Sequence, residues 1–214
     1  MTTAIAASTT DTRTLRRALG NFATGITVIT AQHEGVRAGV TANSFSSVSL
    51  DPPLVLWCLD KRSGSARLFQ QASHFAINIL AVDQIGLSKR FAGGQEDRFA
   101  ELALQEGLGG CLLLEHTSAS FQCARHQILD GGDHWILLGR VEVFEDHGRA
   151  PLVYHQGAYS LVQPHPAPSS PSQYPAKHMA ARRREDPRRP GAQQPRQRQA
   201  LKEALSSLMA TART

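Results

Sequence analysis

The pattern of apolar and polar residues over the first 162 positions predicts a chain that is mainly β. Short apolar runs rich in β-branched and aromatic residues, bounded by Gly, Pro, Asn and Asp, are typical of strands. A hairpin is predicted where Asp130-Gly131-Gly132-Asp133 separates two β-runs within residues 119–146. Further strands are expected over residues 25–32, 36–50, 53–60 and 74–80, and residues 151–162 close the domain.

Three helices are predicted among these strands. Leu15, Ala18, Leu19 and Phe22 recur at helical spacing, which indicates a helix within residues 11–23 that begins at Asp11, Thr12 or Thr14. Residues 63–73 are expected to form a short helix started by Ser63 or Ser65, and residues 81–93 a helix capped near Asp83 and ended by Gly93-Gly94. The predicted helices are too few to alternate with the strands, which argues against a doubly wound parallel sheet. They favour an antiparallel barrel or sandwich with a few covering helices, an α+β arrangement.

One stretch of the pattern stands apart, "GVTANSFSSVSLDPPL" from Gly39 to Leu54. Most of its first eleven residues are small, and Asp51-Pro52-Pro53 then fixes the return of the chain. The stretch suits an edge strand that is polar because water covers it. It equally suits a bed for a flat, partly anionic ligand, because small side chains let hydroxyl and N–H groups approach the ligand closely.

Charge and proline content divide the chain into two parts. After Val162 there are ten Lys or Arg and three Asp or Glu, a net charge of +7, and eight of the eleven prolines. The preceding residues hold the remaining 13 basic and 15 acidic residues, a net charge of −2. We therefore expect one domain over residues 1–162 and a basic, Pro/Arg-rich tail over 163–214 that is disordered apart from a short helix at 199–210.

Several classes of protein lack support in the sequence. Cys58, Cys111 and Cys123 form no CxxC pair, so neither a zinc site nor a disulfide framework is predicted and a reducing cytosol fits best. No secretory leader and no apolar run near the roughly 18 residues of a membrane span appear, which predicts a soluble, cytoplasmic protein without membrane partners. The Rossmann, P-loop, HExxH and Ser-His-Asp signatures are also absent, and no metal is expected.

Two cationic positions remain open on the residues alone. Lys89 and Arg90 would interact favourably with the dipole at the end of the predicted helix over residues 81–93, and would also suit a ligand phosphate. His134 follows the tight turn of the hairpin, where a lone histidine is more often a surface residue than a catalyst.

Five segments in register carry a resemblance to a known family. They are "LRRALGNFATGITVITAQHEGVRAGVTANSFSSVSLDPPLVLWCLDKRS", "HFAINIL" with "LSKRFAG", "GGDHWILLGRVE" and "PLVYHQGAYS". Over about residues 13–162 the sequence resembles the short-chain flavin reductases. These are the reductase components of two-component flavin-dependent monooxygenases, and the pattern is most similar to those that serve aromatic-ring hydroxylases.

The resemblance implies a fold, cofactors and partners. The fold is an FMN-binding split β-barrel, usually a homodimer, that uses FMN or FAD with NADH, or sometimes NADPH. A separate oxygenase receives the reduced flavin. The residues implied in cofactor binding are Thr41, Ala42, Asn43, Ser44 and Ser47 at the isoalloxazine; Cys58, Leu59, Asp60, Ser63, Gly64 and Ser65 along the ribityl chain and phosphate; Lys89, Arg90 and Phe91 at the phosphate end; and Tyr154, His155, Gln156 and Gly157 at the mouth, with His134 facing the nicotinamide as the catalytic residue.

The resemblance predicts hydride transfer from nicotinamide C4 to flavin N5, and two other hypotheses stand beside it. One is a flavin-binding or redox-sensing protein of the same barrel type that does not turn over. The other is a nucleic-acid binder acting through the tail, which is disfavoured because the tail holds a single aromatic residue, Tyr174, and no recognition motif. The choice between FMN and FAD, the choice between NADH and NADPH, and the oxygenase are left open by the sequence.

Overall fold

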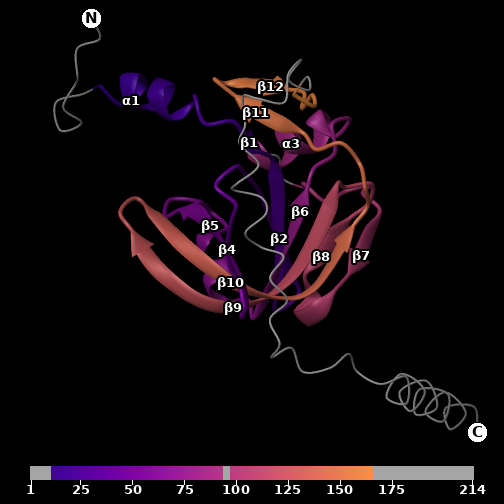
Figure 1. Cartoon of the computed structure of the whole chain (residues 1–214). Coiled ribbons are helices and arrows are strands. Elements are labelled where there is room, and N and C mark those ends of the chain that lie inside the picture. The colour runs from indigo at the N-terminus through magenta and orange to yellow at the C-terminus, as the bar shows by residue number, and fades with distance from the viewer. Residues whose placement is uncertain (1–10, 94–96, 166–214) are drawn as a thin grey trace, which may run out of the picture. The chain divides into compact units, whose positions relative to one another are not determined.

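The computed structural model describes residues 11–93 and 97–165, which fall almost entirely within one compact unit, Met1–Pro164 (Figure 1). Strands dominate this unit and a few helices accompany them, so the predicted mainly β class is confirmed. The predicted tail, with its helix at 199–210, lies outside the described residues except for 163–165. Among the helices that the structure describes, none is long and apolar enough to cross a membrane.

The main sheet has seven antiparallel strands whose two outer members are close in sequence. The order is β3-β2-β6-β9-β10-β5-β4, so β3 and β4 stand at opposite ends, yet only Asn43–Phe45 separates them. Three residues span at most about 11 Å, so the two edges of the sheet must approach each other and the sheet curls into a barrel. The strands are β2 (Thr27–His33), β3 (Val36–Ala42), β4 (Ser46–Leu50), β5 (Pro53–Asp60), β6 (His74–Ile79), β9 (Ala119–Gly131) and β10 (His134–Asp146).

The crossover between β3 and β4 corrects the single strand predicted over residues 36–50. Ala42 still pairs with Thr27 of β2, whereas Ser46 pairs with Leu56 of β5. Between them the side chain of Ser44 replaces a strand contact, because its Oγ accepts from Cys58 N (2.9 Å) and donates to Cys58 O (3.3 Å). Small polar residues therefore break the strand and close the barrel at the same point.

Two smaller sheets and a short turn complete the β structure. Ile26 interrupts the strand predicted over 25–32, because its backbone bonds to Leu80 and Leu152 instead of continuing the ladder. The pair β7–β8 was not predicted, since strands of three residues are too short to reveal a period of two. These elements are β1 (Thr24–Gly25), β11 (Val153–His155) and β12 (Ala158–Ser160) in one sheet, β7 (Leu104–Glu106) and β8 (Leu112–Leu114) in the other, and the 3₁₀ turn η2 (Leu108–Gly110).

The three predicted helices form but are shorter than expected. Asp11, one of the three candidates from the sequence, caps the first by accepting from Arg13 N at 3.2 Å. Asp83 does not cap the third, because its carboxylate binds Arg149 at 2.6 Å, and Gln84 occupies the cap position instead. Ser65 begins the second helix without a side-chain cap bond. The bounds are α1 (Thr12–Leu19), α2 (Ala66–Gln71) and α3 (Ile85–Ala92).

The core lies on both faces of β2, which explains why five consecutive residues of this strand, 27–31, are buried. Ile29 packs inside the barrel with Trp57 and with Phe69 of α2, whose rings meet edge to face at 5.0 Å. Val28 packs on the other face with Phe91 of α3. Burying each of these large side chains stabilises the fold by about 1.5–3 kcal/mol, so α2 and α3 are anchored on opposite faces of β2.

Candidate functional site

A cavity of about 370 Å³ opens where β3, the crossover, the end of β5 and α3 meet. The tip of the β9–β10 hairpin closes one side of this first cavity, because His134 pairs with Asp60 across the β10–β5 ladder. The hairpin turn is the predicted one, with Gly132 in the left-handed region (φ 81°). The cavity is lined by Val40, Thr41, Ala42, Asn43, Ser44, Cys58, Leu59, Asp60, Ser63, Phe91, Ala92, Arg98 and His134.

The wall of small residues is held from behind by its own hydroxyl groups. Thr41 Oγ1 donates to Ser88 O of α3 at 2.7 Å, and Thr27 Oγ1 donates to Ala42 O at 2.7 Å. The Ser44 hydroxyl is engaged with Cys58, as described above. No hydrogen bond from the backbone N–H of Asn43 or Ser44 is found within residues 11–93 and 97–165. The wall therefore offers backbone donors, rather than hydroxyls, to a ligand.

The rim of the cavity carries a set of ion pairs. Asp60 receives two hydrogen bonds from the Arg62 guanidinium (2.9 and 3.2 Å) and one from Arg62 N (2.8 Å). These contacts, with a smaller contribution from the charge of His134, lower the pKa of Asp60 from 3.8 to about 2. Asp60 therefore stays anionic at neutral pH and faces the hairpin tip.

His134 is oriented by its neighbour in the turn. Its Nδ1 lies 2.7 Å from Asp133 Oδ1, and this contact lowers the pKa of Asp133. Lys61 Nζ braces the same tip, because it binds Asp130 at 2.6 Å and lies 4.5 Å from the centre of the Trp135 ring. The hydrogen bond on Nδ1 leaves Nε2 of His134 as the nitrogen available to a ligand.

The structure gathers ten of the nineteen residues proposed from the sequence around this cavity. They come from four separate segments, which only the closed barrel brings together. The ten are Thr41, Ala42, Asn43, Ser44, Cys58, Leu59, Asp60, Ser63, Phe91 and His134. Gly64, Ser65, Lys89, Arg90 and Ser47 do not line it; Ser65 lines a neighbouring cavity instead.

The two cations predicted for a phosphate do not line the cavity. Lys89 is exposed in the last turn of α3. Arg90 donates through Nη2 to the carbonyl groups of Ala100 and Asp97, so it anchors the segment that follows α3. Their predicted contact with a flavin phosphate stays a prediction.

The predicted mouth residues Tyr154–Gly157 lie on the small sheet, near the end of α1. Gln156 N donates to Gly20 O (2.9 Å), and its side chain donates to Asn21 Oδ1 (2.7 Å). Tyr159 OH donates to Ser88 Oγ at 3.1 Å, which links this sheet to the same α3 residue that holds Thr41. The small sheet that carries Tyr154–Gly157 is therefore linked to the cavity wall through Ser88 of α3. The predicted role of these four residues at the mouth of the cavity stays a prediction.

Three lining residues were missed from the sequence: Val40, Ala92 and Arg98. Val40 and Ala92 adjoin predicted site residues, and extending those segments by one position would have found them. Arg98 lies in a segment that the sequence pattern leaves as a loop, and no local motif marks it.

Comparisons with known proteins agree with one another. A family model described as "Flavin reductase like domain" matches residues 19–163. The chain is 47% identical over 150 residues to a "Probable flavin reductase" of Rhizobium meliloti (strain 1021), which covers 70% of this chain and 48% of that protein. It is 48% identical over 148 residues to the reductase component of the flavin-dependent trigonelline monooxygenase of Acinetobacter baylyi, covering 69% of this chain and 48% of that protein. The chain spans about half the length of these two curated relatives.

The fold also matches solved structures. The structure of the NADH:FAD oxidoreductase SgcE6 of Streptomyces globisporus C-1027, in complex with NAD and FAD fragments, aligns with a TM-score of 0.69 and 35% sequence identity. The match covers 72% of this chain and 94% of that chain. The structural neighbours are of the split-barrel type, which confirms that predicted architecture.

Proposed function

Because the chain belongs to the flavin reductase like domain family, we propose that it is an NAD(P)H-dependent flavin reductase. In this proposal FMN or FAD accepts a hydride at N5 from nicotinamide C4, and the reduced flavin passes to a separate monooxygenase component. The observation that carries the proposal is the cavity walled by Thr41–Ser44, where small side chains and unengaged backbone donors meet beside His134.

The residues present fit a flat redox cofactor. When bound, the flavin supplies the hydride acceptor, and the protein supplies orientation and electrostatics. The backbone N–H groups of Asn43 and Ser44 are placed to donate to the polar edge of the ring and to stabilise negative charge there. Phe91 and the bonded hydroxyl of Thr41 hold this wall in place, so the donors are preorganised. His134 lines the side closed by the hairpin tip, from which its Nε2 would reach a bound nicotinamide.

The activity is tested with the purified full chain. NADH oxidation is followed by its absorbance with riboflavin, FMN and FAD as separate acceptors. We expect oxidation that requires both a flavin and the protein. Flavin binding without NADH or NADPH oxidation would instead support the non-catalytic flavin-binding hypothesis. If the protein neither binds flavin nor oxidises NADH or NADPH, both the reductase and the flavin-binding hypotheses are wrong.

We also propose that the protein is a homodimer. β4 stands at one end of the order in the main sheet, and it leaves Leu50 (90% exposed) and Val48 uncovered. Phe144 of β10 is also 67% exposed. Large apolar side chains on an edge strand commonly mark an interface. Sedimentation of the wild type and of Leu50→Glu tests this, because a monomer in both cases would contradict the proposal.

A further inference from the structure

Thr41 lines the first cavity, and the single proton of its hydroxyl group is already used. The residue is half-buried on β3, and its Oγ1 lies 2.7 Å from Ser88 O of α3. A carbonyl oxygen carries no proton, so the hydroxyl group must be the donor in this bond. Across residues 11–93 and 97–165, no group donates to Thr41 Oγ1 in return. The oxygen therefore presents lone pairs, and no proton, to a ligand in the cavity.

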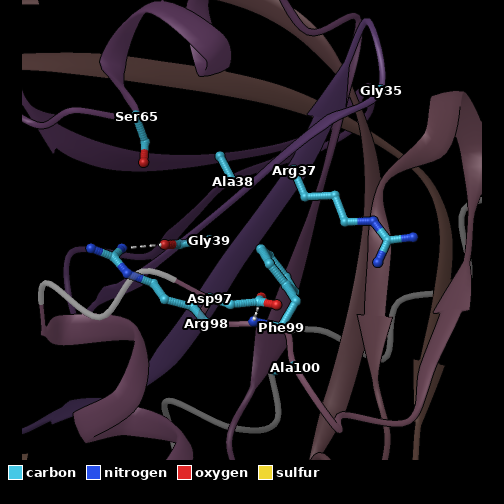
Figure 2. Close-up of a pocket in the computed structure, with 9 residues that line it drawn as sticks. All are labelled: Gly35, Arg37, Ala38, Gly39, Ser65, Asp97, Arg98, Phe99 and Ala100. Carbon is cyan, nitrogen blue, oxygen red and sulfur yellow. Dashed lines mark hydrogen bonds between the residues drawn. The ribbon is translucent and has the colours of Figure 1, made fainter.

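Buried neighbours fix the direction of this hydroxyl group. Ser88 is 2% exposed, and its own Oγ accepts from Tyr159 OH at 3.1 Å. Two residues before Thr41, Gly39 O accepts from Arg98 Nη1 at 2.8 Å, a contact drawn in Figure 2. β3 is thus tied to α3 and to the segment after it at two points. Turning the Thr41 proton towards the cavity would break a buried hydrogen bond, which is unfavourable.

The rest of the cavity wall has the opposite polarity. The backbone N–H groups of Asn43 and Ser44 have no partner in the described part of the chain, so they are donors for a ligand. An acceptor at Thr41 stands two and three residues before them on the same segment. In oxidised flavin, N5 is an acceptor beside the polar edge of the ring. On reduction N5 gains a hydrogen and becomes a donor, so the match between ring and wall changes with the redox state.

We propose that Thr41, positioned by Ser88, accepts from N5–H of reduced flavin and thereby favours the reduced over the oxidised cofactor. This rests on the proposed function, which places the flavin ring in the first cavity. The same oxygen would face the N5 lone pair of oxidised flavin without a hydrogen bond. Tighter binding of the reduced form raises the reduction potential of the bound flavin, by about 30 mV for each tenfold difference in affinity. The contact therefore favours hydride transfer from the nicotinamide to the flavin.

The test compares the Kd of oxidised FMN with that of chemically reduced FMN, measured without oxygen on the full chain. Thr41→Val keeps the shape of the side chain and removes its hydroxyl group. We expect the affinity for reduced FMN to fall about tenfold relative to that for oxidised FMN, as for loss of one hydrogen bond. The reduction potential of the bound FMN should fall by about 30 mV. Thr41→Ser, which keeps the hydroxyl group, should restore the wild-type ratio.

Thr27→Val is the matched control for a purely structural role. Thr27 Oγ1 also donates to a backbone carbonyl, Ala42 O, at 2.7 Å, but Thr27 is buried behind the wall and does not line the cavity. This variant should lower the melting temperature and leave the ratio of the two Kd values unchanged. An unchanged ratio in Thr41→Val would overturn the proposal. An equal shift in Thr27→Val would overturn it too, because the shift would then come from the loss of support for the wall.

A flavin analogue tests which ring atom is involved. In 5-deaza-FMN a carbon atom replaces N5, so its reduced form has no N–H at this position. We expect Thr41→Val to change the Kd of reduced 5-deaza-FMN by less than about twofold. A loss as large as that for reduced FMN would place the contact at another atom and would overturn the proposal.

The same measurements separate this inference from the proposed function. If Thr41→Val shifts the ratio but the wild type oxidises no NADH or NADPH with any flavin, the proposed function fails and this inference stands. If the wild type oxidises NADH with FMN and the ratio is the same in Thr41→Val, the inference fails and the proposed function stands. The absence of FMN binding in both redox states would overturn both.

Discussion

Ala42 is the residue at which the proposed flavin-binding wall, Thr41–Ser44, is most easily tested. It is half-buried, lines the first cavity and is the last residue of β3. Replacing its methyl group by a leucine side chain in Ala42→Leu extends bulk into the cavity while β3 keeps its pairing with β2. We expect the affinity for flavin to fall by at least about tenfold. The leucine side chain would occupy space that the flavin needs, and a packed site accommodates added bulk only at a cost in free energy. Fluorescence titration with riboflavin measures it.

A matched replacement separates blocking from unfolding. Ala158→Leu places the same group on an exposed residue of β12, away from the cavity. Both variants should keep a melting temperature near that of the wild type. Normal flavin affinity in Ala42→Leu would show that residues 39–54 form an ordinary edge strand covered by water and not a flavin-binding surface.

His134 is expected to act on the nicotinamide and not on the flavin. Its ring lines the cavity at the hairpin tip, held by Asp133 at 2.7 Å. In His134→Ala the apparent KM for NADH should therefore rise by about tenfold, the order expected when one polar contact is lost, with the Kd for flavin unchanged. Steady-state kinetics with saturating flavin and direct flavin titration separate the two constants. A loss confined to flavin affinity contradicts this role.

The stability of the fold is expected to depend on pH through Asp60, and the contacts of its carboxylate determine the direction of that dependence. Arg62 lowers the pKa of this carboxyl group from 3.8 to about 2 in the folded protein. The contact therefore stabilises the fold above about pH 3.8, and that contribution is lost as the pH falls through about 2. We expect Asp60→Asn to lower the melting temperature at neutral pH and the difference from the wild type to shrink towards pH 2. Arg62→Gln should show the same profile, and the double variant should add little to either change.

At the scale of single residues, the sequence located the cavity wall but not its chemistry. The small residues at 39–48 could be identified because their lack of bulk is visible in the sequence. The use of the Thr41 and Ser44 hydroxyls by Ser88 O and Cys58 could not, because those partners are 14 to 47 positions away. Arg90 and Arg98 look alike in sequence, and only the structure shows that Arg90 binds Ala100 O in the segment after α3 whereas Arg98 binds Gly39 O of β3 and lines the cavity.

At the scale of elements, β3 and α3 are in contact through a glycine. A Cβ on Gly39 would lie 2.6 Å from Cδ1 of Phe91 and 3.0 Å from Cζ of Phe99. Gly39→Ala must therefore push α3 and the segment after it away from the sheet, at a cost of about 1–3 kcal/mol. Chemical denaturation should show this loss. Gly86→Ala, in α3 with no atom within 4 Å of the added carbon, should be neutral or stabilising; equal losses in the two variants would refute close packing at Gly39.

Elements with a clear local pattern were predicted well, and those defined by distant partners were not. β5 has the predicted bounds, Pro53–Asp60, because a nearly continuous apolar run lies between Asp51-Pro52 and Asp60. The crossover at Asn43–Phe45 escaped prediction because nothing local shows that β3 and β4 pair with different strands. β8 escaped because its contacts come from Asn78, whose amide binds Leu112 O and Leu114 N from another element.

At the scale of the whole molecule, the barrel and the basic tail are expected to be separable. The family model ends at residue 163, close to the predicted boundary, and the charges differ in sign on its two sides. We therefore propose that residues 1–162 fold and function without residues 163–214. The truncated protein should keep the melting temperature, the flavin Kd and the NADH oxidation of the full chain within about twofold, because the described core lies before this boundary.

The same truncation decides whether the tail has a binding role of its own. A segment with a net charge of +7 attracts polyanions, and such binding weakens steeply with salt because counterions are released. With one aromatic residue in the tail, stacking on bases has little support, so we expect no DNA mobility shift at physiological salt from either protein. A shift by the full chain that vanishes on truncation and fades with salt would assign nucleic-acid binding to the tail. A fall in flavin reduction on truncation would instead show that residues 163–214 contribute to the barrel or its site, and the two-part division of the chain would be wrong.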